Sequence, residues 1–141
     1  MFMQQKQTAA IALFCNAQGI IRALLYHQLP TTHKFIEGQP FPASMAPGSV
    51  EKAHKFFDTL QAQGTALDWE MNVILGEELL GLRFVGITSG RDCLILGAET
   101  SGEIMRLSKE LKPLNAGLFT ALSAVLAQWR VQQKQTLNWQ S

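Results

Sequence analysis

The chain has no long apolar run and no excess of charge of either sign. No segment of its 141 residues approaches the roughly 18 consecutive apolar residues that a membrane-spanning helix needs. Twelve basic residues nearly balance eleven acidic ones, which leaves a net charge of +1. Proteins that bind nucleic acid or anionic membranes through charge carry a basic excess. We therefore expect no nucleic-acid partner and no membrane insertion.

Cysteine is scarce as well. Cys15 and Cys93 are the two that occur, and both lie in apolar runs typical of strands. The N-terminus has one Lys and a short apolar run, without the apolar core and the small-residue cleavage site of a signal peptide. Two cysteines in a chain without an export signal favour reduced core residues over a disulfide. The sequence thus predicts a cytoplasmic protein with two buried thiols.

Metal-binding and catalytic motifs are missing from the sequence. The three histidines, His27, His33 and His54, have no Cys, His, Asp or Glu at the spacing of metal ligands. Asp68 and Glu70 share one exposed strand face, whereas carboxylates that work as an acid–base pair need different environments. We therefore expect no metal site and no catalytic activity of its own, and no cofactor can be named.

One stretch alternates apolar and polar residues and indicates a half-buried strand. In LDWEMNVIL, from Leu67 to Leu75, an apolar residue stands at every odd position, which turns Trp69 and Met71 inward. Short glycine-containing breaks separate neighbouring apolar runs, so adjacent antiparallel strands are expected. The sequence predicts an α+β fold with a five-stranded antiparallel sheet, whose other strands are residues 11–16, 20–27, 79–88 and 91–99.

Helical periodicity predicts three further segments. The first lies between an N-cap at Ser49 and a helix-ending Gly64. The second begins at Thr100 or Ser101, and the third covers about residues 115–133. Because the last two strands are apolar on both faces, both faces of the sheet need a cover. The C-terminal helices are the candidates for the second cover.

The C-terminal helix carries an apolar seam. Its members recur at spacings of four, three and four residues: Leu118, Leu122, Val125 and Trp129. This spacing is typical of a coiled coil, but it ends in under two heptads, before Gln132. A homodimer through this seam and packing within the chain are equally open.

The order of these elements resembles the PAS sensory fold. The phrases that carry the resemblance are NAQGIIRALLYH, FPASMAPGSVEKAHKFFDTLQAQGTALDWEMNV and LRFVGITSGRDCLILGAE. The middle phrase is similar to the region of sensor histidine kinases where a proline-containing loop opens the long helix and a strand with a Trp-Glu pair follows. The resemblance implies a PAS-like sensory domain over residues 1–112, with helices on one face of the sheet. Residues 113–141 would then form a flanking connector or dimerisation helix and its tail.

The resemblance also implies a sensory or dimerisation role in signal transduction, as in two-component systems. A PAS domain binds a small-molecule ligand or dimerises, and passes the change through its flanking helix to a kinase or other output domain. The side chains that would line a ligand pocket between sheet and helix are Phe14, Tyr26, Phe57, Trp69, Met71 and Phe84. Aromatic residues of this kind also build an ordinary core, and the sequence favours a filled core or a small cavity over a ligand pocket.

Two other classes of protein stay open. A scaffold of the roadblock or profilin-like kind also combines a five-stranded sheet with helices, and it would bind protein partners without a small molecule. A small α+β enzyme would need a polar pair buried in a cavity. A tightly packed interior would favour the scaffold, whereas a buried Asp or His beside Tyr26 would favour the enzyme.

Overall fold

The computed structural model describes residues 9–29, 34–75, 77–89, 92–113 and 116–140, the side chains of 89, 116, 118 and 133–140 excepted. Its elements follow one another along the chain as two strands, two short 3₁₀ turns, a helix, three strands and two helices. They are β1 (Ala10–Cys15), β2 (Ile21–Gln28), η1 (Phe41–Ser44), η2 (Pro47–Ser49), α1 (Val50–Gln63), β3 (Thr65–Leu75), β4 (Glu78–Ser89), β5 (Asp92–Ala98), α2 (Ser101–Glu110) and α3 (Ala116–Gln140).

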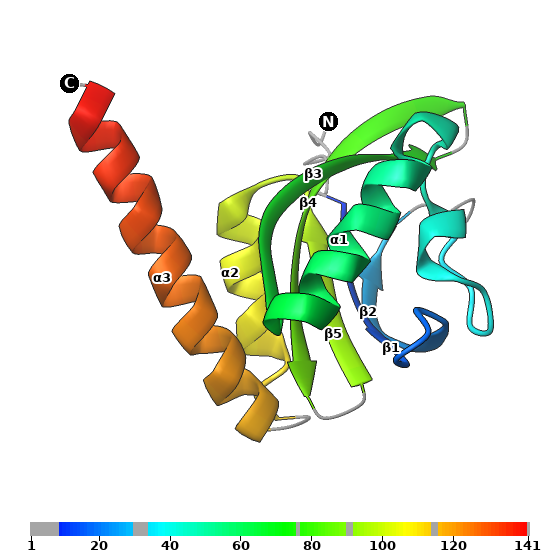
Figure 1. The fold of residues 1–141 in the computed structure, drawn as a ribbon, viewed down its shortest axis with the longest axis horizontal. Coiled ribbons are helices and arrows are strands. Elements are labelled where there is room, and N and C mark those ends of the chain that lie inside the picture. Colours follow the sequence, from blue (N-terminus) through cyan, green and yellow to red (C-terminus); the bar gives the residue numbers. More distant parts are fainter. Residues whose placement is uncertain (1–8, 30–33, 76, 90–91, 114–115, 141) are drawn as a thin grey trace, which may run out of the picture.

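The five strands form one antiparallel sheet in the order β2-β1-β5-β4-β3 (Figure 1). The chain leaves the β1–β2 hairpin, passes through η1, η2 and α1, and returns as a β3–β4–β5 meander. The last strand of the meander pairs with β1 and joins the two parts. This arrangement confirms the predicted α+β class and the five-stranded antiparallel sheet.

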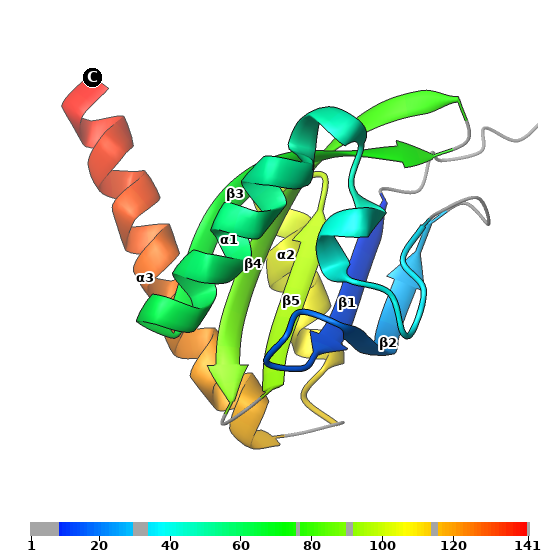
Figure 2. The same cartoon turned by 45° about the vertical axis from the view of Figure 1, so that its right-hand side comes forward.

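Helices cover both faces of the sheet. Figures 1 and 2 show α1 on one face and α2 and α3 on the other. Each face has its own apolar cluster, which we call the α1-side core and the α2-side core. The helices α2 and α3 supply the second cover that the apolar faces of β4 and β5 require. The expectation that helices lie on one face, with a flanking helix beyond them, is replaced by a three-layer arrangement.

The predicted helix ends are correct at two of three positions. Gly64 has a φ of 80° and ends α1, and the Thr100 hydroxyl accepts a hydrogen bond from the Glu103 amide at 3.1 Å. Ser49 occupies the N-cap position of α1 but makes no cap hydrogen bond there. Its hydroxyl instead accepts a bond from the Asn72 amide on β3 at 2.9 Å. Tertiary contact thus redirects the hydroxyl from its own helix to a strand.

A bulge at Asp68 interrupts the predicted alternation of β3. Asp68 has a φ of 56°, and the pairing of β3 with β4 shifts at this point. Because one extra residue reverses the faces of a strand, Leu67 packs in the α2-side core, whereas Trp69 packs in the α1-side core. Asp is among the residues that tolerate this backbone conformation, and its carboxylate accepts a 2.8 Å bond from Arg83. The regular alternation holds from Trp69 onward.

Both edge strands of the sheet are irregular and partly covered by other segments of the chain. The register of β2 against β1 shifts twice, and the backbone of Ile21 is hydrogen-bonded to residues 38–39. On the other edge, β3 has the bulge at Asp68, and the amide of Asn72 is bonded to Ser49. Bulged and covered edges resist edge-to-edge association. These contacts cover one end of the β2 edge and the middle of the β3 edge.

The close packing of β5 against β4 predicts a sensitive position at Gly97. A Cβ atom there would lie 2.5 Å from the ring of buried Phe84 on the neighbouring strand. We expect Gly97→Ala to lower the free energy of unfolding by about 1–3 kcal/mol, because the ring must move within a filled core. The matched control is Gly48→Ala, where a Cβ meets nothing within 4 Å. Urea unfolding measures both variants, and equal stabilities would contradict this packing.

Candidate functional site

The six side chains expected to line one pocket lie on opposite faces of the sheet. Four belong to the α1-side core: Phe57, Trp69, Met71 and Phe84. The other two belong to the α2-side core: Phe14 and Tyr26. Neighbouring residues of a strand point to opposite faces of the sheet. The sequence pattern of a helix shows which side of the helix is apolar, but it does not show which face of the sheet the helix will cover. These six residues therefore cannot line a single cavity.

The layer between α1 and the sheet is filled by aromatic rings. Phe41 from η1 lies in the middle, with ring centroids 5.6 Å from Phe84, 5.9 Å from Phe56 and 6.4 Å from Phe35. Phe56 in turn meets Trp69 edge-on at 5.8 Å. Tilted and edge-to-face rings at these separations are the favoured geometry of aromatic pairs. The interior of this layer is thus occupied by the chain's own side chains.

Three members of this aromatic cluster, Phe35, Phe41 and Phe56, were not among the six residues expected to line the pocket, and two of them come from outside the regular elements. Phe35 and Phe41 are both fully buried and come from the irregular segment before α1. An irregular segment has no period that would assign a packing partner to its apolar side chains. The contacts of Phe41 with Phe84 and Phe56, and of Phe35 with Phe41, follow from tertiary structure alone.

The buried polar groups do not form a catalytic pair in the part of the chain that the structure describes. The buried polar side chains there are all serines: Ser44, Ser49 and Ser108. A serine nucleophile needs a base within hydrogen-bond reach, whereas Ser49 is bonded to a strand amide and Ser108 donates to the Met105 carbonyl. The described residues also hold no group of three or more His, Cys, Asp or Glu placed to bind a metal ion.

A second candidate surface lies where β2 borders α2, which we call the β2 margin. It consists of the half-buried side chains Phe14, Leu25 and Tyr26 at the border of the α2-side core. The helix α2 is centred on β5 and β1, and α3 contacts β4 and α2. The outer face of β2 lies beside this cover, so its apolar side chains keep part of their surface exposed.

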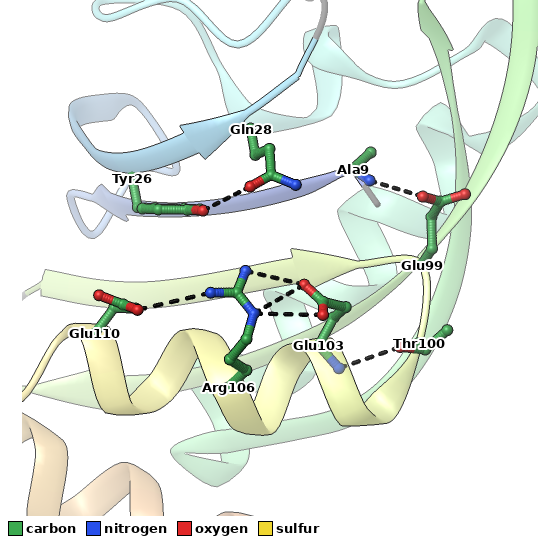
Figure 3. Close-up of polar contacts among 8 residues, drawn as sticks. All are labelled: Ala9, Tyr26, Gln28, Glu99, Thr100, Glu103, Arg106 and Glu110. Carbon is green, nitrogen blue, oxygen red and sulfur yellow. Dashed lines mark hydrogen bonds and ion pairs between the residues drawn. The ribbon is translucent and has the colours of Figure 1, made fainter. Parts of the chain in front are cut away.

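Charged groups of both signs border the β2 margin (Figure 3). The Arg106 guanidinium donates to the Glu103 carboxylate at 3.0–3.3 Å and lies 3.6 Å from Glu110. The Glu103 carboxylate, with the Tyr26 hydroxyl, raises the pKa of Arg106 above its ordinary value. The Tyr26 hydroxyl also donates to the Gln28 amide oxygen at 2.9 Å. The rim of the β2 margin is therefore formed by Arg106 between the carboxylates of Glu103 and Glu110, beside the phenol group of Tyr26.

The predicted seam of the C-terminal helix packs within the chain. Leu122 and Trp129 are buried in the α2-side core, and Val125 is partly buried there. The side chain of Leu118 lies outside the described residues. Leu126, which was not part of the predicted seam, is buried as well. A dimer through this seam would have to draw α3 off the sheet.

The two cysteines are free and buried, as expected, and they face one another. Cys15 on β1 is the register partner of Cys93 on β5, and both belong to the α1-side core. Burial raises the pKa of Cys15 to about 12, with a contribution from nearby Cys93. Burial also raises the pKa of Cys93, while a hydrogen bond from Gln61, with its Nε2 3.8 Å from the sulfur, lowers it. Both sulfurs are thus protonated at neutral pH.

Raising the pH is expected to destabilise the fold through Cys15. Its folded pKa of about 12 lies above the ordinary value of 9.0, so unfolding releases a proton above pH 9. The stabilisation is complete below pH 9 and is lost as the pH rises toward 12. Compared with a Cys15→Ala variant, the wild type should lose about 1.4 kcal/mol per pH unit in this range. Urea unfolding at mildly and strongly alkaline pH measures this, and parallel stability curves would contradict it.

Comparison with known proteins does not add a family. No protein-family model matches the chain, and no curated protein matches it. In the described residues, no helix is long and apolar enough to cross a membrane. The five-stranded antiparallel α+β arrangement is shared by several classes of protein, so the likeness to PAS domains rests on the sequence phrases quoted above.

Proposed function

We propose that the chain is a non-catalytic dimerisation module of the scaffold kind, which works through its surface and encloses no small molecule. The observation that carries this proposal is the continuous set of ring contacts between α1 and the sheet, from Phe35 through Phe41 to Phe84 and from Phe56 to Trp69. A ligand in this layer would have to displace a ring from a contact of 5.6–6.4 Å. A filled interior of this kind favours the roadblock or profilin-like alternative.

The β2 margin is the surface that best suits a second copy of the chain. Specific interfaces combine an apolar centre with a polar rim and favour Tyr, Phe and Arg. A two-fold dimer places one patch against itself, so its rim must carry both signs of charge. Arg106 beside Glu103 and Glu110 meets this requirement.

Reversing one charge of the rim is expected to separate the copies. Arg106 is exposed, and Arg106→Glu would place three carboxylates on each copy, which repel one another across the two-fold axis. We expect the dissociation constant to rise at least tenfold and the effect to weaken at high salt. The control is Lys52→Glu, which makes the same change of net charge on exposed α1, across the sheet. Native mass spectrometry measures both variants, with circular dichroism to verify folding.

The same mass spectra decide between the scaffold and a ligand-binding module. The wild type should appear as a dimer whose mass equals twice the denatured mass. A stoichiometric added mass that disappears on denaturation would contradict the proposal of a filled, ligand-free interior. A monomeric wild type, or equal weakening by the two charge reversals, would contradict the β2 margin as the dimer surface.

The placement of α3 favours a second candidate, the sensory module that the resemblance implies. Leu122, Leu126 and Trp129 attach α3 to the α2-side core. Figures 1 and 2 show the C-terminal part of α3 extending beyond the other elements. A helix attached through one short apolar strip can shift between two packings. A ligand or partner would move that equilibrium by the difference in its affinity for the two states.

Hydrogen exchange tests whether α3 leaves the sheet in the native protein. If it does, the amides of α3 should exchange through a local opening that requires less free energy than global unfolding. The amides of β1 and β5 should exchange only through global unfolding. Trp129→Ala should speed the exchange of α3, because it removes a buried anchor, whereas the exposed Gln128→Ala should not. Mass spectrometry of peptides from α3 and the sheet gives both rates. Exchange of α3 only with global unfolding would contradict the sensory candidate.

A further inference from the structure

The two thiols meet the geometric conditions for a bond between neighbouring strands. Cys15 and Cys93 are directly opposed on β1 and β5, and both side chains lie on the α1 side of the sheet. Opposed residues of antiparallel strands have Cα atoms about 4.5 or 5.5 Å apart, and disulfides span Cα separations of about 4.4–6.8 Å. Closing the bond requires the two Cβ atoms to approach one another within the existing register.

The pair also lies close to the molecular surface. Gln61 of α1 is exposed, and its Nε2 contacts the Cys93 sulfur at 3.8 Å and donates to the Ala17 carbonyl at 3.1 Å. The Cys93 sulfur thus lies directly beneath a surface side chain, beside the turn between β1 and β2. A change of the Gln61 rotamer would admit a small uncharged molecule. While Gln61 keeps its present rotamer, its N–H lowers the pKa of Cys93 and so favours negative charge on the sulfur.

We propose that Cys15 and Cys93 are a reversible modification site, at which hydrogen peroxide forms an intramolecular disulfide between β1 and β5. The Cys93 thiol gives its proton to solvent, and its sulfur attacks one peroxide oxygen. The O–O bond breaks, hydroxide leaves and takes up a proton, and a sulfenic acid remains on Cys93. The reaction is slower than at an exposed thiolate, because the buried sulfurs stay protonated.

The second step joins the two strands. The Cys15 sulfur attacks the Cys93 sulfur and loses its proton, while the sulfenic hydroxyl leaves as water. In total, two thiols lose two electrons and two protons, and one peroxide is reduced to two waters. A thiol reductant such as dithiothreitol restores both thiols by exchange. The site lies on the α1 side of the sheet, whereas the β2 margin lies on the α2 side.

Peptide mapping of the folded wild-type protein tests the proposal. The protein is treated with hydrogen peroxide, and catalase removes the excess peroxide. It is then denatured in the presence of N-ethylmaleimide, which alkylates free thiols, and digested with trypsin without reductant. Trypsin places Cys15 in peptide 7–22 and Cys93 in peptide 92–106. We expect these two peptides to be linked, an intact monomer lighter by two hydrogens, and full reversal by dithiothreitol. Two alkylated thiols after peroxide treatment, or a link between two molecules, would overturn the proposal.

Single variants test the order of the two steps. Cys15→Ser should stop at the sulfenic acid of Cys93, which dimedone traps in peptide 92–106. Cys93→Ser should leave Cys15 at least tenfold less reactive toward peroxide and dimedone, because Cys15 lacks the contact with Gln61. Circular dichroism verifies that both variants fold. Equal dimedone labelling of the two variants would overturn the assignment of Cys93 as the first sulfur to react.

Discussion

The pairing of β1 with β5 is the contact on which the rest of the molecule depends. It joins the first hairpin to the β3–β4–β5 meander, which the chain reaches only after the long segment containing α1. The helix α2 lies across both strands and seals one face, while the aromatic cluster fills the other. Without this pairing, the β1–β2 hairpin would lose its contact with the meander, and the apolar side chains of β1 would be exposed to water. The opposition of Cys15 and Cys93 is a consequence of the same register.

The two cores differ in character, and the difference directs function to the surface. In the α1-side core, several rings pack against Phe41. A ligand bound there would break several of these aromatic contacts at once. The α2-side core ends at β2, where Tyr26 and its neighbours stay half-buried beside Arg106. An apolar surface bordered by both signs of charge supports the proposed dimer, since such a patch can complement a copy of itself.

The thiol pair, the β2 margin and α3 can be probed separately because they occupy different places in the fold. The thiols lie in the α1-side core, whereas the margin and the anchors of α3, such as Trp129, belong to the α2-side core. The sheet lies between the thiol pair and the other two features, and α2 lies between the β2 margin and α3. Oxidation, association and release of α3 are therefore probed by changes at different residues.

Local patterns in the sequence determined the strands, the helices, the end of α1 at Gly64 and the cap at Thr100, because each depends on residues a few positions apart. They also placed both thiols in the interior. Only the tertiary structure decided that Ser49 bonds to β3, that the bulge at Asp68 turns Leu67 to the other face, and that the predicted pocket residues are split by the sheet. It also decided that the seam of α3 is satisfied within the chain. These outcomes depend on strand order, register and the face that each helix covers, which are set by contacts between residues far apart in the sequence.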